Sequence, residues 1–225
     1  MRRFIDRKEA GLELAATLHS FAHKPDVVVI ALPRGGVPVA REVAEALEVP
    51  LDVLTVQKLE LKDANESCIG AIAADGPTTV DWRTADSLRV SDVAIDALIA
   101  REREDLVHRD RFYRMVKPVV DIAGKTVLVI DDGVASGTTM TTAIAALRKR
   151  RPARVVVAAP VASRQAQDVI YRLADAAIFL YTPHRLYSVG LWYENYSPVT
   201  DAEVMRVLQR DTGRRLTPSS LTAHA

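Results

Sequence analysis

Two adjacent carboxylates, Asp131 and Asp132, stand directly after an apolar run and directly before a loop of small residues. The apolar run, Val127 to Ile130, is rich in β-branched residues and is typical of a buried strand. From Met140 to Leu147 the apolar spacing becomes helical. The pattern therefore predicts that both acids lie at the solvent-facing C-terminal end of a strand, beside the N-terminus of a helix.

This arrangement suits a ligand that carries both a phosphate and hydroxyl groups. The free backbone N–H groups of a helix N-terminus attract a phosphate, and the hydroxyls of Ser136, Thr138 and Thr139 add further donors. Two carboxylates would repel a bare phosphate, but they accept hydrogen bonds from sugar hydroxyls and bind a hard divalent cation. The chemistry points to a sugar phosphate. The alternative is a plain turn in which the acid and the serine only cap the helix.

Other phosphate-binding motifs are absent from the sequence. It has no G-x-x-x-x-G-K-[ST] loop, and neither Gly35-Gly36 nor Gly133 with Gly137 completes a G-x-G-x-x-G fingerprint. A Walker-type loop and a dinucleotide fingerprint are therefore excluded.

Residues 127–139, VLVIDDGVASGTT, resemble the binding motif for phosphoribosyl pyrophosphate (PRPP) in the type I phosphoribosyltransferases. That motif consists of an apolar strand, two acids, a few small residues and Ser/Thr-Gly-x-Thr. The resemblance implies that Asp131 and Asp132 are catalytic, that they hold the ribose hydroxyls, and that they help to hold Mg²⁺ as the cofactor. The residues implied to bind the 5-phosphate are Val134, Ala135, Ser136, Gly137 and Thr138.

A second loop, Leu32 to Gly36, follows the first predicted strand and lies at the sheet edge where ligands of open α/β folds bind. Gly35 and Gly36 allow backbone N–H groups to form an anion nest, and Arg34 adds a positive charge. The similar loop of the phosphoribosyltransferases holds pyrophosphate, often through a strained or cis peptide, which implies the same role for Arg34, Gly35 and Gly36. Alternatively, the segment is a tight turn with a surface arginine.

Basic residues follow the second predicted strand. The segment 57–62, QKLELK, resembles the start of the mobile catalytic loop in orotate phosphoribosyltransferases, which implies that Lys58 neutralises the departing pyrophosphate. Lys62 is the weaker candidate, and solvated lysines on a hairpin explain both residues equally well. The charge-dense segment 101–117 mixes acids and bases at helical spacing and is interpreted as a solvated helix face. The alternative is that a few of its arginines reach pyrophosphate when the loop closes.

Aromatic residues gather in the segment 181–196, YTPHRLYSVGLWYENY. They indicate either a packed lid or a platform on which a planar base stacks. The segment resembles the base-binding hood of the 6-oxopurine phosphoribosyltransferases. This resemblance implies that Tyr187 stacks on the base, that the Ser188 backbone faces the edge of the base, and that Glu194 helps to hold magnesium.

Two residues differ from the 6-oxopurine pattern, so the resemblance does not identify the acceptor base. The 6-oxopurine enzymes carry an acid for the purine N7 where this chain has Ala135, and a lysine for the 6-oxo group where it has Ser163. Ala135 is compatible with orotate- and adenine-type loops. The resemblance therefore covers the scaffold from about Val27 to Tyr196 without identifying the base.

Apolar strands alternate with helical segments, which predicts an α/β fold with a mostly parallel five-stranded sheet flanked by helices. We expect one phosphoribosyltransferase domain over residues 1–210. Within it, residues 58–125 are expected to form a flexible loop or hairpin–helix insertion and residues 181–200 a hood or lid, followed by a disordered tail over 211–225. The predicted strands are Val27–Leu32, Leu51–Gln57, Val127–Ile130, Val155–Ala159 and Ala177–Tyr181.

The composition is that of an ordinary globular protein of 225 residues, with 48% hydrophobic and 26% charged residues. A net charge of +1 argues against strong nucleic-acid binding. The single cysteine, Cys68, excludes an internal disulfide and a cysteine-based metal site. The sequence lacks a signal peptide and an apolar run of membrane-spanning length, so we expect a cytoplasmic protein with no membrane partner. We also expect a homodimer.

The expected activity is transfer of a phosphoribosyl group from PRPP to a nitrogenous base, with release of pyrophosphate, in nucleotide salvage. This expectation comes from the family resemblance. Two alternatives stay open. One is a non-catalytic sensor of PRPP or a nucleotide on the same fold, and the other is a hydrolase or phosphorylase that acts on nucleotides at the same site.

Overall fold

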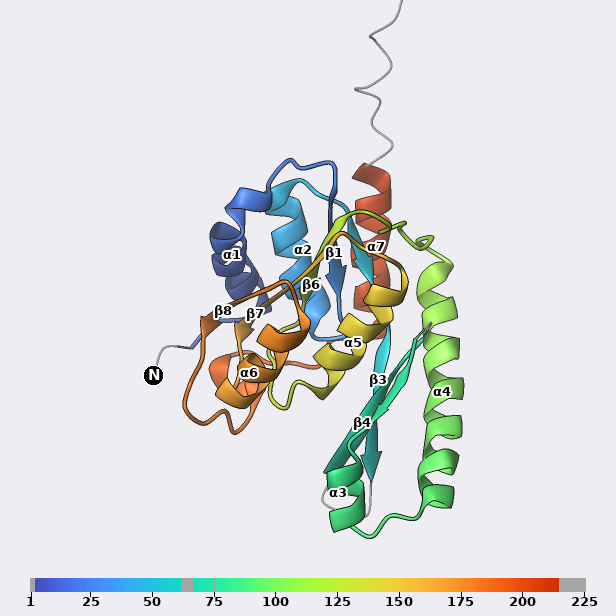
Figure 1. Ribbon diagram of the computed structural model, residues 1–225. Coiled ribbons are helices and arrows are strands. Elements are labelled where there is room, and N and C mark those ends of the chain that lie inside the picture. Colours follow the sequence, from blue (N-terminus) through green and yellow to red (C-terminus); the bar gives the residue numbers. More distant parts are fainter. Residues whose placement is uncertain (1–2, 62–66, 75, 215–225) are drawn as a thin grey trace, which may run out of the picture.

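The apolar, β-branched runs of the sequence form a central sheet. In the computed structural model, which describes residues 3–61, 67–74 and 76–214, five strands form this sheet in the order β2-β1-β6-β7-β8 (Figure 1). The neighbouring strands pair in parallel, which confirms the predicted sheet. The strands are β1 (Val27–Ala31), β2 (Leu51–Val53), β6 (Thr126–Ile130), β7 (Arg154–Val161) and β8 (Ala176–Tyr181).

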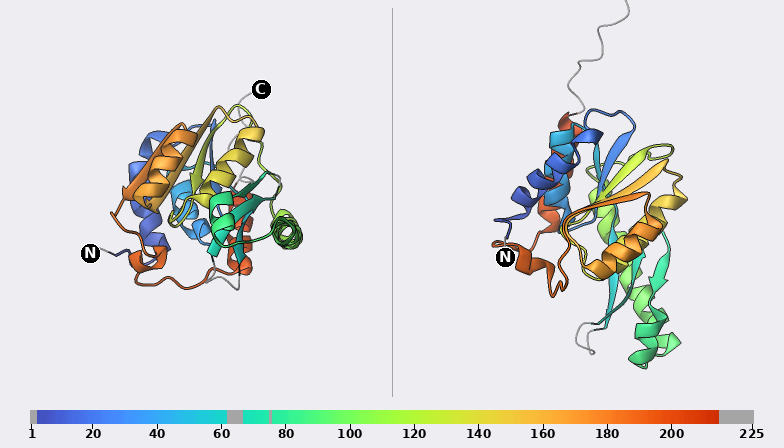
Figure 2. Two further views of the ribbon diagram at one scale, coloured as in Figure 1. Left: turned by 60° about the horizontal axis from the view of Figure 1, so that its bottom comes forward. Right: turned by 60° about the vertical axis from the view of Figure 1, so that its left-hand side comes forward.

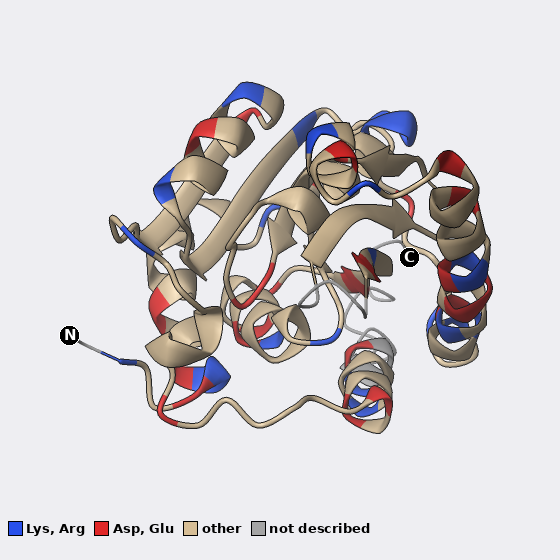
Figure 3. Cartoon of the chain, turned by 90° about the horizontal axis from the view of Figure 1, so that it is seen from below, with Lys and Arg blue, Asp and Glu red and all other residues tan. Residues whose placement is uncertain are grey.

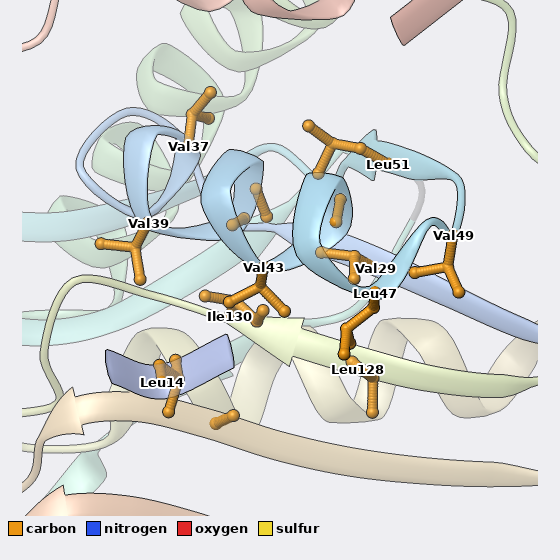
Figure 4. Close-up of a cluster of buried hydrophobic side chains, with 14 of the residues drawn as sticks. Leu14, Val29, Val37, Val39, Val43, Leu47, Val49, Leu51, Leu128 and Ile130 are labelled. Atoms are coloured by element: carbon orange, nitrogen blue, oxygen red, sulfur yellow. The ribbon is translucent and has the colours of Figure 1, made fainter. Parts of the chain in front are cut away.

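Helices cover both faces of the sheet, because its strands bury apolar side chains on both sides. Figure 4 shows the core on one face, where Val43 and Leu47 of a helix meet Val29, Leu128 and Ile130 of the sheet. That face is covered by α1 (Arg7–Thr17), α2 (Gly36–Leu47) and α7 (Asp201–Arg214), and the opposite face by α5 (Thr138–Lys149) and α6 (Arg164–Leu173).

The insertion forms an arm that projects from the central sheet (Figure 1, Figure 2). Its strands make a second, antiparallel sheet in the order β3-β4-β5, and a long helix packs along it. The arm has its own apolar core, which includes Leu59, Ile69, Ile72, Ile95 and Leu106. Its elements are β3 (Val56–Leu61), β4 (Ser67–Ala73), β5 (Thr78–Val80), α3 (Trp82–Ser87) and α4 (Asp92–Arg114). The sequence pattern did not predict β5 or α3, which are short.

The chain leaves the central sheet for the arm at Leu54 and Thr55. The Leu54 N–H donates to the carbonyl of Ala31 in the central sheet, whereas the Thr55 carbonyl accepts from the N–H of Ala74 in the arm, each at 3.0 Å. The single strand predicted over 51–57 is therefore two strands in two sheets. Apolar periodicity indicates a strand but does not identify its partner, which explains the error.

The hood packs against the N-terminal segment of the chain. The Phe4 N–H donates to the carbonyl of Trp192 at 2.8 Å, and the rings of Phe4, Tyr181, Trp192 and Tyr193 form one cluster. The packed-lid interpretation therefore applies to these aromatic residues. The two short 3-10 helices of the chain's described part are η1 (His19–Phe21) and η2 (Val189–Trp192).

The first helix, α1, is capped at its N-terminus by Asp6. The Asp6 carboxylate accepts hydrogen bonds from the backbone N–H groups of Lys8 and Glu9, each at 2.9 Å. The Glu9 carboxylate accepts from the N–H of Ile5, one residue before the expected partner in a capping box. These contacts place Arg7 in the first turn of α1, directly after its cap.

The predicted tail starts too early, because the C-terminal helix α7 includes residues 211–214. The helix continues past Asp211 to Arg214, because Val204 and Leu208 are buried against the central core and Lys117 forms an ion pair with Asp211. The remainder of the predicted tail, 215–225, lies outside the described residues. Within the described part of the chain, no helix combines the length and apolar character needed to cross a membrane.

Candidate functional site

A cleft of about 440 Å³ opens at the C-terminal ends of β1 and β6. Parallel strands bring the loops that follow them to one edge of the sheet, so residues far apart in the sequence meet there. The predicted site residues that line the cleft are Arg34, Gly35, Lys58, Asp131, Asp132, Val134, Ala135, Ser136 and Gly137. Gly36 and Thr138 are outside the described lining, and each begins the helix that follows its loop.

The small-residue loop after β6 exposes backbone at the start of α5. Gly137 has a φ of 84°, in the left-handed region that glycine adopts without steric cost. Ser163 supports the loop, because its N–H donates to the Val134 carbonyl at 2.9 Å and its hydroxyl donates to the Ala135 carbonyl at 2.6 Å. Ala135 and Ser136 are exposed. A loop of this shape at a helix N-terminus suits a phosphate.

The loop after β1 packs against one of the two acids. The peptide bond between Pro33 and Arg34 is cis, in agreement with the loop conformation that the family resemblance implies. A Cβ atom at Gly35 would come within 2.3 Å of Oδ2 of Asp132, so no side chain fits at this position. The Arg34 side chain is half exposed, and its Nη1 lies 3.5 Å from Oδ2 of Asp201 in α7.

The two adjacent acids have different surroundings. Asp132 is 6% exposed, and its Oδ2 accepts a hydrogen bond of 2.8 Å from Nε of Arg7. The Tyr193 hydroxyl also donates to the Asp132 carbonyl, at 2.6 Å. The prediction that both acids face solvent is therefore wrong for Asp132, because α1 and the hood cover it. Asp131 is partly buried, and burial together with the negative charge of Asp132 raises the pKa of the Asp131 carboxyl.

Arg7 lines the cleft and was not identified from sequence motifs. Its Nη1 donates to the Ser197 carbonyl at 2.9 Å, and its Cζ lies 4.0 Å from the centre of the Tyr196 ring. Burial opposes the charge of Arg7, but the charge of Asp132 and the hydrogen bond to it outweigh burial and raise the pKa of the guanidinium. No local signal in the first helix could have revealed that Arg7 lines the cleft, since its partner Asp132 is distant in the sequence.

The arm contributes two basic residues to the cleft, Lys58 from β3 and Arg109 from α4. Nζ of Lys58 lies 3.7 Å from Oε1 of Glu60, and Nη1 of Arg109 donates to Oε1 of Gln57 at 2.8 Å. Mixed charges do run along α4, as Figure 3 shows. One side of α4 packs on β3, so the solvated-face interpretation does not hold at Arg109, which lines the cleft. That an arginine of this segment reaches pyrophosphate stays a prediction.

The hood residues predicted to bind the base do not line the cleft. Tyr187 is 78% exposed, and Ser188 and Glu194 are also exposed. None of these three is among the described residues that line the cleft, whereas Val189 and Tyr196 of the same segment are. The high exposure of Tyr187 also separates it from the packed aromatic cluster of the hood. Its role in base binding stays a prediction.

A sequence model of the phosphoribosyl transferase domain matches residues 6–178 of this chain. The match covers more than half of the 225 residues, so the protein belongs to the phosphoribosyl transferase family. Its fold is the α/β fold of the type I phosphoribosyltransferases, as the motif at 127–139 indicated.

Similar proteins are known from Mycobacterium tuberculosis and Thermus thermophilus. Two curated proteins from Mycobacterium tuberculosis, one from strain CDC 1551 / Oshkosh and one from strain ATCC 25618 / H37Rv, carry the words phosphoribosyl transferase in their names. Each is 35% identical over 213 residues, which cover 93% of this chain and 47% of the relative, so the chain spans about half the length of these relatives. The crystal structure of TT1426 from Thermus thermophilus is 36% identical, with a TM-score of 0.76 over 93% of this chain and 99% of that chain.

We predict that Asp131→Asn stabilises the fold at neutral pH. Because the pKa of Asp131 is raised in the folded state, stability falls as the pH rises from the unfolded-state pKa through the folded-state pKa. The variant should therefore melt at a higher temperature than the wild type at about pH 7, by about 2–4 °C for each kcal/mol gained. The gain should vanish at about pH 3, where the carboxyl is largely protonated in both states. Thermal denaturation at several pH values measures both effects, and a lower melting temperature at neutral pH would contradict the assigned environment.

Proposed function

We propose that this protein transfers the phosphoribosyl group of PRPP to a nitrogen atom of a base and releases pyrophosphate. One observation carries the proposal: a single cleft is lined by a small-residue loop that precedes a helix, two acids and a second, arginine-bearing loop. These groups correspond to the phosphate, the ribose hydroxyls and the pyrophosphate of PRPP. Membership of the phosphoribosyl transferase family supports the same reaction.

Each part of the cleft has a proposed partner on PRPP. The 5-phosphate binds the loop from Val134 to Thr138, where backbone N–H groups precede α5. The ribose hydroxyls donate to the acid pair, and Asp131 is the more accessible of the two carboxylates. The pyrophosphate binds the loop of Arg34, Gly35 and Gly36, with Lys58 on the arm side of the cleft.

The donor set of the cleft fits Mg²⁺ shared with the substrate. Mg²⁺ is commonly held by one or two carboxylates together with substrate phosphates and water, not by a cage of side chains. In the described ranges of the chain, no three His, Cys, Asp or Glu side chains cluster as metal ligands. Asp131 and Asp132 would contribute to the shared site, with Glu194 proposed as a further ligand from the hood. When bound, the ion would neutralise part of the pyrophosphate charge.

In the proposed reaction, the bond between ribose C1 and a pyrophosphate oxygen breaks, and a bond between C1 and the acceptor nitrogen forms. The pyrophosphate leaves with the electron pair, and the acceptor nitrogen releases a proton. Negative charge therefore grows beside Arg34 and Lys58, while positive charge grows on the ribose ring near Asp131. Preorganised charges of this kind stabilise such a transition state, so the residues act by positioning and charge, not by covalent catalysis.

Binding and turnover test this proposal separately. Isothermal titration with PRPP and Mg²⁺ should show binding, and mass spectrometry after incubation with a panel of nucleobases should reveal one nucleotide and an equal amount of pyrophosphate. Absence of PRPP binding at millimolar concentration would contradict the proposal. Binding without turnover would favour a non-catalytic sensor, and phosphate-dependent release of base from a nucleotide would favour a phosphorylase. A role in nucleotide salvage and assembly as a homodimer belong to the same proposal.

Replacement of Gly137 tests the phosphate loop. Gly137→Val places a β-branched side chain at a φ of 84°, where it is strained, and should distort the loop that binds the 5-phosphate. We predict that the affinity for ribose 5-phosphate falls by at least about tenfold, or about 1.4 kcal/mol. Gly124→Val is the matched control, since Gly124 has a φ of 69° and nothing within 4 Å of an added Cβ. The control should leave ribose 5-phosphate binding unchanged, and unchanged binding in Gly137→Val would place the phosphate elsewhere.

Replacement of Tyr187 tests the hood. Tyr187→Ala removes a ring that we propose to stack on the base, at a cost of about 1–3 kcal/mol by analogy with base stacking in single-strand binders. Tyr187→Phe keeps the ring and should bind nucleotide almost as the wild type does. Neither variant should change the unfolding midpoint, because Tyr187 is 78% exposed. Nucleotide affinity that is equal in all three proteins would remove Tyr187 from the site.

A further inference from the structure

The guanidinium of Arg7 reaches the cleft from the first turn of α1 and is held there by three neighbours. It donates to Oδ2 of Asp132 at 2.8 Å and to the Ser197 carbonyl at 2.9 Å, and its Cζ lies 4.0 Å from the centre of the Tyr196 ring. The side chains of Arg7 and Asp132 are only 10% and 8% exposed. The ion pair is therefore fixed between α1, the end of β6 and the hood.

The Asp132 oxygen that binds Arg7 also contacts the arginine-bearing loop after β1. A Cβ atom at Gly35 would approach this same Oδ2 to 2.3 Å, so the ion pair lies directly against the loop proposed to bind pyrophosphate. The contacts to Asp132 and Ser197 use Nε and Nη1, and Tyr196 shares a further side-chain hydrogen bond with Arg7. A guanidinium carries more N–H donors than these contacts use. Arg7 is thus placed beside an anion site with donors to spare.

The charges in the cleft argue for the same role. Two ionised acids beside a pyrophosphate would repel it strongly in a partly buried site. Arg7 neutralises the charge of Asp132. Among the described contacts, Asp131 has no arginine partner, so its charge is not compensated in this way. An arginine is also suited to phosphate groups, because its planar donors match their oxygens.

We propose that the two acids have separate tasks: Asp131 accepts from the ribose hydroxyls, whereas Asp132 is a positioning residue that holds Arg7 against the loop of Arg34 and Gly35, where Arg7 binds the pyrophosphate. This inference rests on the proposed function and refines it. The proposed function assigns both acids to the ribose hydroxyls and to Mg²⁺, whereas the inference leaves these two tasks to Asp131 alone. It makes α1 and the hood part of the pyrophosphate site.

Separate probes for the two halves of PRPP test the inference. Arg7→Gln, Arg7→Lys and Asp132→Asn are titrated with pyrophosphate and with ribose 5-phosphate, both in the presence of Mg²⁺. Arg7→Gln should weaken pyrophosphate binding by at least about tenfold and ribose 5-phosphate binding by less than about twofold. Arg7→Lys should recover part of the loss, because the charge is kept. Asp132→Asn should show the same selective loss, whereas Asp131→Asn should weaken ribose 5-phosphate binding.

Arg114→Gln is the matched control for a broken ion pair. Nη1 of Arg114 lies 2.6 Å from Oδ1 of the fully buried Asp52, and neither residue lines the cleft as described. This control should lower the melting temperature and leave both affinities unchanged. If Arg7→Gln does not fold, the double variant Arg7→Gln/Asp132→Asn removes both charges, so no unpaired charge stays buried, and it should show the same selective loss.

The possible outcomes separate this inference from the proposed function. A loss of stability with both affinities at the wild-type level would make Arg7 a structural residue and overturn the inference, and so would an equal loss of both affinities. In either case the proposed function would stand, because the wild type binds both probes. A wild-type protein that binds neither probe would overturn the proposed function and this inference together.

Discussion

A buried carboxylate is stable only when an opposite charge or several hydrogen bonds replace the water it has lost, and Asp132 imposes this requirement on its surroundings. Arg7 supplies the charge, which ties α1 to the end of β6. Gly35 lacks a side chain where one would collide with the same carboxylate. Tyr193 and Tyr196 cover the pair from the hood. Four segments of the chain therefore meet at one ion pair, and the shape of the cleft depends on it.

Asp131, the residue directly before Asp132, has no arginine partner among the described contacts. It shares the strand end with Asp132, yet its pKa is raised by burial and by the charge of that neighbour, so its ionised form is held at a cost to stability. Groups that bind ligands are commonly held in such unfavourable surroundings. Sugar hydroxyls or a cation would relieve the cost, which is consistent with the role that we propose for Asp131.

The cleft also draws on parts of the chain beyond the central sheet. The arm has a core of its own and supplies Lys58 and Arg109, whereas Tyr196 comes from the hood, which follows the family match over residues 6–178. Asp201 of α7 pairs with Arg34 of the cleft. The match thus accounts for the two loops and the acids that define the family. The hood therefore contributes to the cleft from beyond the matched residues.

Local patterns were sufficient to predict the parallel sheet, the two loops at its C-terminal edge and the acids beside them, because strand periodicity, glycine turns and the spacing of small residues are properties of consecutive residues. Other features depended on which distant segments touch. Arg7 pairs with Asp132 across 125 positions, and Arg109 turns toward Gln57 because α4 packs on β3. The burial of Asp132, the exposure of Tyr187 and the division of residues 51–61 between two sheets follow in the same way from packing. Solvent exposure and charge pairing are decided by neighbours in space, so only the tertiary structure could assign them.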